Sequence, residues 1–110
     1  MYHEKLKCYQ IALEVLKEVN VMTKVMPRGL GNVNDQIKRA MTSSVLNLVE
    51  GNAKYAKAER RRFFQISLGS LAESAACIDI YYSLNLISSE KQNHIKSRLK
   101  AVYSMIYKLQ

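Results

Sequence analysis

The chain has 110 residues and a formal net charge of +8, and 48% of its residues are hydrophobic. This length suits one domain with a single core, and the hydrophobic fraction excludes a disordered chain. So high a charge on a small domain indicates an anionic partner, which can be nucleic acid, a membrane surface or an acidic protein.

The sequence also argues against a membrane or secreted protein. No segment approaches the roughly 20 uninterrupted apolar residues that a membrane span needs. The charged N-terminus is not followed by the apolar block of a signal peptide. Cys8 and Cys77 are isolated on apolar helix faces, so we expect them to be buried as small hydrophobic residues, without a disulfide or a metal. A reducing, cytoplasmic setting fits these features.

The first predicted helix runs from about His3 to Met26. Apolar residues recur along it at alternating spacings of four and three, which is typical of a helix that buries one face. These residues are Cys8, Ala12, Val15, Val19, Met22 and Met26. Pro27 disfavours helix before it, and Gly29 and Gly31 provide a turn.

The second predicted helix is capped by Asn32 or Asn34 and ends at Gly51, a residue type favoured just past helix C-termini. Two lines of residues run along it, about 100° apart. The apolar line is Ile37, Met41, Ser44 and Leu48. The other line is small or polar and consists of Gln36, Ala40, Ser43, Asn47 and Glu50. A polar line beside the core predicts a neighbouring helix with matching hydrogen-bond partners.

The third predicted helix begins between Ala56 and Glu59 and continues to about Leu86. Its apolar line is Phe64, Leu68, Leu71, Ala75, Ile78 and Tyr82. The fourth helix begins at a capping box formed by Ser89-Glu90-Lys91-Gln92. Its apolar line is Ile95, Leu99, Val102, Ile106 and Leu109.

No stretch of the chain alternates with period two, so no strands are expected. Long amphipathic helices with short connections predict an all-α fold, an antiparallel up-and-down four-helix bundle that spans residues 1–110 as one domain. A steeper crossing of the first two helices is the alternative.

An ordered set of residues in this chain resembles one known family. The set is Pro27, Gln36-x-x-Arg39-Ala40-x-x-Ser43-x-x-Asn47-x-x-Glu50-Gly51, Phe64 and Gly69-Ser70-x-x-Glu73. The chain resembles the four-helix-bundle proteins encoded in intervening sequences of bacterial 23S ribosomal RNA genes. That family includes the accessory (variability determinant) proteins of diversity-generating retroelements. The resemblance covers the chain from about Leu6 to Leu109, and its most specific part is the pairing of the Asn47–Gly51 and Gly69–Glu73 motifs.

The resemblance implies a four-helix bundle that assembles into a ring-like homopentamer and has no known catalytic activity. For the retroelement branch it implies a basic ring that binds nucleic acid and a reverse transcriptase, which makes mutagenised cDNA from a template RNA. The ribosomal-RNA branch carries no assigned role. The chain departs from the family pattern where the third helix begins. Ala56 holds the place of a hydroxyl cap and Arg60 that of an aromatic residue, so the beginning of this helix is less well defined than in the family pattern.

The main candidate binding surface is a basic cluster at residues 54–62. Its cations are Lys54, Lys57, Arg60, Arg61 and Arg62, and its one acid is Glu59. Arginines near a helix N-terminus oppose the helix dipole by roughly 0.3–1 kcal/mol each, so helix stability does not explain them. Arginine and the free N–H groups of a helix start both bind phosphate, and Tyr55 can stack on a base. The alternatives are contact with a membrane or an acidic protein, or a solvated surface paired with Glu59 or another subunit.

A second basic run lies in the fourth predicted helix. It consists of Lys91, Lys96, Arg98, Lys100 and Lys108, with the acid Glu90. In an antiparallel bundle the end of this helix lies near the start of the third. We therefore expect Lys108 to join the basic cluster and Lys91 to lie at the opposite end. The other cations point in different directions, so we interpret the run as a contribution to the positive electrostatic field of the protein and not as a binding site.

The polar residues of the second and third helices predict a buried hydrogen-bond network that fixes their register. Its members are Gln36, Arg39, Ser43, Asn47, Glu50, Ser70 and Glu73. We expect Arg39 to neutralise one of the acids. The sequence supports a catalytic role of Glu50 and Glu73 less well than this structural role, because neither a glycine-rich loop nor a nearby His accompanies them. His3 and His94 lack a second ligand at helical spacing, so no metal and no cofactor are expected.

The sequence therefore predicts a non-catalytic, basic, homo-oligomeric protein that binds RNA or DNA mainly through the backbone. Tyr81, Tyr82, Tyr103 and Tyr107 are candidates for a subunit interface. The favoured role is that of an accessory factor beside a reverse transcriptase in a diversity-generating retroelement. The alternative is a scaffold or protein-interaction bundle of the ribosomal-RNA branch without a nucleic-acid role.

Overall fold

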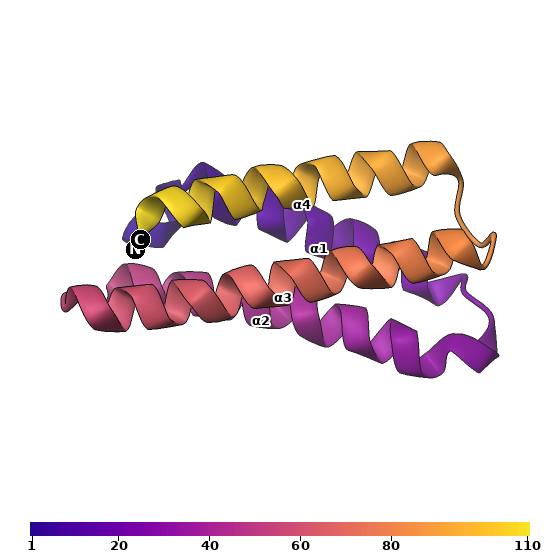
Figure 1. The fold of residues 1–110 in the computed structure, drawn as a ribbon, viewed down its shortest axis with the longest axis horizontal. Coiled ribbons are helices and arrows are strands. Elements are labelled where there is room, and N and C mark those ends of the chain that lie inside the picture. The colour runs from indigo at the N-terminus through magenta and orange to yellow at the C-terminus, as the bar shows by residue number, and fades with distance from the viewer.

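Four long α-helices lie side by side in the computed structural model, which describes residues 1–110 and measures 44 × 23 × 21 Å. They are α1 (Lys7–Lys24), α2 (Gly31–Ala53), α3 (Lys57–Ser83) and α4 (Ser89–Leu109). Short 3₁₀ helices, η1 (Tyr2–Lys5) and η2 (Arg28–Leu30), precede α1 and α2. The chain reverses direction at each connection, and its two termini lie together at one end of the bundle (Figure 1). No strand forms, and the prediction of an all-α, four-helix fold is confirmed.

The pair formed by α2 and α3 dominates the architecture. These are the two longest helices, with 23 and 27 residues, and they make the most extensive contact between elements. Their connection projects beyond the chain termini at one end of the molecule (Figure 1). We call residues 50–64, which comprise this connection and the adjoining helix ends, the α2–α3 tip.

The ends of α2 differ from the prediction at both sides. Leu30 precedes the helix and no side chain caps it, so the predicted cap at Asn32 or Asn34 is wrong. Asn34 instead accepts a hydrogen bond of 2.5 Å from the Tyr81 hydroxyl of α3. Gly51 does not end the helix, which continues to Ala53. A Cβ at Gly51 would lie 2.6 Å from Cε1 of Phe64, so this glycine allows the aromatic ring to pack directly on α2.

The other boundaries differ by a few residues from the prediction. α1 begins at Lys7 because residues 2–5 form η1. α3 ends at Ser83, and Asn85 adopts the left-handed conformation (φ 61°) that commonly terminates helices. The N-cap of α4 is Ser88, whose hydroxyl accepts a 3.0 Å hydrogen bond from the Lys91 amide, so the capping box at Ser89 is wrong by one residue.

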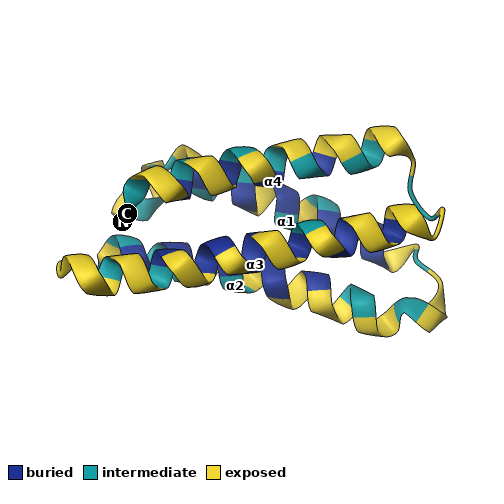
Figure 2. Ribbon diagram, viewed as in Figure 1, coloured by how far each residue is buried: buried dark blue, intermediate teal, exposed yellow.

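The hydrophobic core runs along the inward sides of all four helices, and the outward sides are exposed (Figure 2). Most predicted apolar positions are buried, but Tyr82 is 41% exposed and Tyr81 is fully buried in its place. The buried face of α3 follows spacings of three and four through Phe64, Ser67, Leu71, Ser74, Ile78 and Tyr81. Two buried serines hide this line from a reading based on hydropathy, which explains the misplacement of Tyr82.

Both cysteines belong to the core. Cys8 and Cys77 are 3% exposed, and burial raises the pKa of each thiol; the nearby Glu73 raises that of Cys77 further. No helix combines the length and hydropathy needed to cross a bilayer.

Candidate functional site

Arg60 closes the turn at the α2–α3 tip. Its Nη1 donates hydrogen bonds to the carbonyl oxygens of Asn52, at 3.2 Å, and Lys54, at 3.1 Å. Its guanidinium lies 5.3 Å from the ring centroid of Phe64. The two carbonyls belong to the C-terminal end of α2, where the helix dipole favours a cation. Arg60 therefore has a structural role in the fold. It stands where the family pattern has an aromatic residue, and its guanidinium packs on the ring of Phe64.

The other two arginines of the tip and Lys57 point outward. Lys57, Arg61 and Arg62 are exposed and take part in none of the ion pairs of the chain. Glu59, the acid of the cluster, is exposed and equally without an ion pair. Tyr55 is fully exposed in the turn. The tip thus presents three cations and an aromatic ring to solvent.

Lys54 differs from these cations because it has partners within the chain. Its Nζ lies 3.5 Å from Oε2 of Glu50 and 5.4 Å from the ring centroid of Phe63. Arg62 approaches the same ring, with Cζ 5.0 Å from the centroid. Phe63 therefore holds two cationic groups of the tip.

Lys108 lies on the last turn of α4 and is exposed. The end of α4 contacts α3 just past the tip, because Gln65 Nε2 donates a 2.7 Å hydrogen bond to Oε1 of Gln110. This places the end of α4 near the start of α3, as the sequence predicts. Lys108 makes no ion pair or hydrogen bond of its own with the tip.

Two of the five cations in the basic run of α4, Lys91 and Arg98, pair with acids of α1. Arg98 Nη1 lies 2.8 Å from Oε1 of Glu18, and Nη2 pairs with Glu14. Lys91 and His94 contact the other oxygen of Glu18, at 3.9 and 3.2 Å. Two acids of α1 thus serve three basic side chains of α4.

An acid of α3 neutralises a further cation of this run. Lys96 Nζ donates a 2.8 Å hydrogen bond to Oδ1 of Asp79, which lowers the pKa of that carboxyl below its ordinary value. Gln92, from the same face of α4, donates to the same oxygen at 2.9 Å. Lys100 and Lys108 are the two cations of the run without an acid partner.

The predicted polar network is divided into two separate groups. In one, Gln36 donates to Glu73 and accepts a 3.2 Å hydrogen bond from Arg39. All three side chains of this group are exposed. Arg39 reaches Gln36 and makes no ion pair with an acid, so the prediction that it neutralises one is wrong.

The second group joins α2 to α3 near the middle of the bundle. Ser70 Oγ donates to Ser43 Oγ at 3.0 Å, and Asn47 Nδ2 donates to the carbonyl and hydroxyl oxygens of Ser43 at 2.9 and 3.1 Å. Deeper in the core, Ser67 Oγ donates to the carbonyl oxygen of Ser44 at 2.7 Å.

The sequence did not identify the contact between Ser44 and Ser67. Ser44 stands in the apolar line of α2, and the spacing of three between Phe64 and Ser67 is the one signal that places Ser67 on the buried face.

Glu50 and Glu73 do not form a pair. Glu50 contacts Lys54, whereas Glu73 contacts Gln36. Gln36 and Glu50 are 14 residues apart in α2, which corresponds to about 20 Å along the helix axis. Within one chain the two carboxylates are too far apart to act on one substrate as acid and base.

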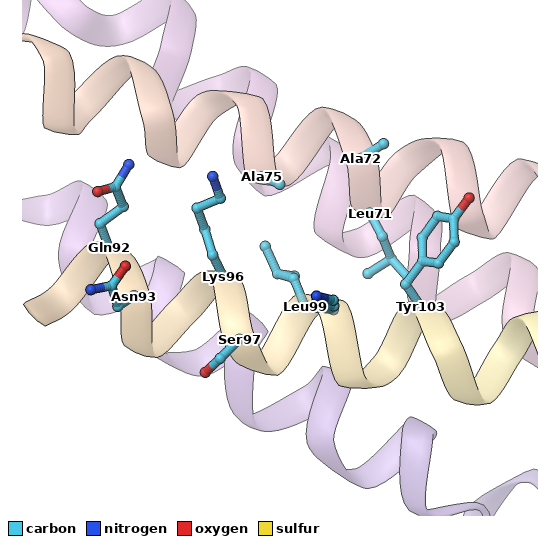
Figure 3. Close-up of a pocket in the computed structure, with 10 residues that line it drawn as sticks. Leu71, Ala72, Ala75, Gln92, Asn93, Lys96, Ser97, Leu99 and Tyr103 are labelled. Carbon is cyan, nitrogen blue, oxygen red and sulfur yellow. The ribbon is translucent and has the colours of Figure 1, made fainter. Parts of the chain in front are cut away.

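A groove of about 540 Å³ lies between α3 and α4 (Figure 3). Ala72, Ala75 and Leu71 of α3 face Lys96 and Tyr103 of α4 across it. No carboxylate or imidazole lines this groove, and no three His, Cys, Asp or Glu side chains gather anywhere in the chain to hold a metal. The tip therefore remains the strongest candidate site.

A family model matches the sequence, and a solved structure matches the fold. The model of the 23S rRNA-intervening sequence protein family matches residues 4–108. The chain belongs to this family. A crystal structure of a protein with unknown function from the S23 ribosomal protein family of Bacteroides thetaiotaomicron has a TM-score of 0.82 to this fold, with 93% of each chain covered and 16% sequence identity. At this identity the likeness shows a shared fold. No curated protein matches the chain.

Proposed function

We propose that this member of the 23S rRNA-intervening sequence protein family is a non-catalytic, oligomeric protein that binds RNA or DNA through the α2–α3 tip. The observation that carries the proposal is the group of exposed cations at the tip, Lys57, Arg61 and Arg62, which have no acid partner within the chain. Cations left free in the fold are available to external anions.

The proposed mechanism is electrostatic. Each phosphate that a Lys or Arg side chain neutralises releases condensed counterions, so the affinity falls steeply as salt rises and depends little on sequence. Arginine additionally forms two parallel hydrogen bonds to one phosphate. Arg60 serves this surface indirectly, because its hydrogen bonds to Asn52 and Lys54 hold the turn that carries Tyr55.

Tyr55 supports nucleic acid over an acidic protein as the partner. A fully exposed aromatic ring on a helix connection contributes nothing to the core. Beside phosphate-binding cations, the ring offers a flat surface on which a base can stack. An acidic protein surface has no base to occupy it.

We further propose that antiparallel bundles of this kind assemble into a homopentamer in a cytoplasmic setting. The family resemblance supports the ring, and exposed apolar side chains on α3 and α4 supply a surface for it. Ile66 and Ile80 are 43% and 41% exposed, and Tyr103 and Tyr107 are 40% and 59% exposed. An assembly would bring several tips together, which multiplies the positive field that each chain presents.

The proposed biological role is that of an accessory factor in a diversity-generating retroelement. The tip would bind template RNA or cDNA while another face binds a reverse transcriptase, and the family resemblance supports this partner. A reverse-transcriptase gene with template and variable repeats beside this gene is the expected genomic context. A gene inside an interrupted ribosomal RNA gene, with no binding to nucleic acid, would favour the scaffold alternative.

A salt titration of binding tests the proposed function. The purified chain is titrated against labelled RNA and DNA of equal length, with fluorescence anisotropy read at several salt concentrations, and its mass is measured in solution. We expect binding to both, with log Kd rising linearly with log salt. Absence of binding at about 0.05 M salt, where surface charges are weakly screened, would overturn the proposal.

A further inference from the structure

The two adjacent phenylalanines of the tip do different work. Phe64 is fully buried, with its ring against Gly51 and under Arg60. Phe63 is partly buried, and its ring lies under the cationic groups of Lys54 and Arg62. One ring therefore anchors the turn in the core, and the other fixes the position of two cations on the surface.

The turn between α2 and α3 is held firmly although it projects from the bundle. Arg60 donates to two carbonyl oxygens in it, and Phe64 fits directly against the backbone of α2 at Gly51. Tyr55 is carried on this fixed segment with its whole side chain in solvent. Because the backbone that carries Tyr55 is held in place, contact with a ligand costs the rotamer freedom of the side chain but little backbone entropy.

The ligand face of the tip thus combines an isolated aromatic ring with ordered cations. Lys54, next to Tyr55 in the chain, has its ammonium over Phe63 together with the guanidinium of Arg62. Glu50 and Glu59 are the acids of the tip; Glu50 pairs with Lys54, and Glu59 lowers the net charge by one. Lys57 and Arg61 add two further free cations.

We propose that the α2–α3 tip selects single-stranded nucleic acid, with Tyr55 stacking on an unpaired base and the surrounding cations contacting the adjacent phosphates. The inference rests on the proposed function and specifies its substrate class. The reason is geometric, because the bases of a duplex stack on one another and show only their edges, whereas every base of a single strand can offer a flat face. Phe63 acts as a positioning residue for Arg62 and Lys54 and touches no base.

Three probes of equal length separate stacking from phosphate contact. They are an oligothymidylate, a strand of the same sugar–phosphate backbone without bases, and a blunt DNA duplex. We expect the wild-type protein to bind the oligothymidylate about tenfold more tightly than the abasic strand, as one stacked base provides. The duplex should bind with the salt dependence of phosphate contacts and without the stacking gain.

Substitutions at Tyr55 identify the stacking ring. Tyr55→Leu keeps an apolar side chain of similar size but removes the aromatic face, so oligothymidylate affinity should fall about tenfold, to the level of the abasic strand. Tyr55→Phe keeps the ring and should bind as the wild type does. Because Tyr55 is fully exposed, neither change should alter thermal unfolding.

Phe63 provides an independent readout of cation positioning. Phe63→Leu should weaken binding to the oligothymidylate and the abasic strand by the same factor, about threefold, because it loosens cations and not a base contact. Phe63→Tyr should restore the affinity. An effect on the oligothymidylate alone would show that Phe63 stacks on bases and would overturn the positioning role.

The outcomes distinguish the two proposals. Equal affinity for the oligothymidylate and the abasic strand, unchanged by Tyr55→Leu, would overturn the single-strand inference and leave salt-dependent nucleic-acid binding in place. Tighter binding of the duplex than of the oligothymidylate would also overturn it. Failure of all three probes and of an RNA strand of the same length to bind would overturn the proposed function itself.

Discussion

The α2–α3 tip and the basic run of α4 have similar charge in the sequence but differ in the fold. Each has five cations; the tip has two acids, Glu50 and Glu59, and the run has one, Glu90. In α4, three of the cations, Lys91, Lys96 and Arg98, contact acids of α1 or α3. At the tip, Lys54 alone has an acid partner, and Arg60 is used to close the turn.

This contrast teaches that the available charge of a surface depends on partners distant in the chain. The acids that neutralise Arg98 are Glu14 and Glu18, which belong to the first helix. The tip escapes such pairing because it projects beyond the ends of α1 and α4 (Figure 1). Three cations of the tip, Lys57, Arg61 and Arg62, therefore remain without an acid partner.

The largest expected effect concerns the backbone contact that supports the tip. Gly51→Ala places a methyl group 2.6 Å from the buried Phe64 ring, so overpacking of about 1–3 kcal/mol outweighs the gain of about 1 kcal/mol in helix propensity. We expect a net loss of about 1 kcal/mol in the free energy of unfolding, measured by urea denaturation.

Gly69 provides the matched control for this change. It also lies inside a helix, but no atom stands within 4 Å of the position that a Cβ would occupy there. Gly69→Ala should therefore stabilise the protein by about 0.5–1 kcal/mol. Equal stabilisation by both substitutions would contradict the close packing of Phe64 on α2.

A second expected effect lies at the opposite end of the α2–α3 pair. Burial raises the pKa of Tyr81 to about 12, and the proximity of Cys77 contributes. Because the unfolded chain releases this proton near pH 10, stability from this group is complete below pH 10 and is lost between about pH 10 and 12. The loss should reach about 1 kcal/mol near pH 11.

Tyr81→Phe should remove the contribution of Tyr81 to the alkaline loss, measured as the difference between denaturation curves at about pH 8 and pH 11. The buried thiols of Cys8 and Cys77, whose pKa values are also raised, supply the loss that remains. The same substitution at Tyr107, which is 59% exposed, should leave the alkaline loss unchanged. Identical pH dependence in wild type and Tyr81→Phe would show that another group causes the loss.

A smaller effect tests whether ion pairs within the chain keep the basic run of α4 from binding nucleic acid. Glu18→Gln removes the acid partner of Lys91 and one of the two acid partners of Arg98, so positive charge of α4 becomes available and nucleic-acid affinity should rise about threefold at low salt. Glu90→Gln changes the net charge equally but frees no paired cation, and its gain should be smaller. Equal gains in affinity would show that the total charge of the chain, and not the local ion pairs, determines nucleic-acid binding.

The helices and their core could be predicted from the sequence because hydrophobic periodicity records which side of each helix is inward. The lines in α1, α2 and α4 were placed correctly. The prediction failed where the inward residue is a serine, as at Ser67 and Ser74, because hydropathy does not distinguish a hydrogen-bonded buried hydroxyl from an exposed one.

The sequence predicts the basic cluster of the candidate site but not the different roles of its residues. Arg60, Arg61 and Arg62 are equivalent in the sequence, yet only Arg60 turns back to the carbonyl oxygens of α2. Gly51 reads as a helix end because glycine is common there, and its contact with Phe64 depends on the crossing of two helices. Both roles are set by tertiary packing, which local sequence does not encode.

The most direct test compares the two basic regions by removing three charges from each. The tip variant carries Lys57→Gln, Arg61→Gln and Arg62→Gln, and the run variant carries Lys91→Gln, Lys96→Gln and Lys100→Gln; oligonucleotide affinity is measured across a salt titration. The account predicts that the tip variant loses at least about tenfold in affinity near 0.1 M salt, with a salt slope smaller by up to about 2, while the run variant stays within about twofold of wild type. An equal or larger loss in the run variant would contradict the assignment of the binding surface to the tip.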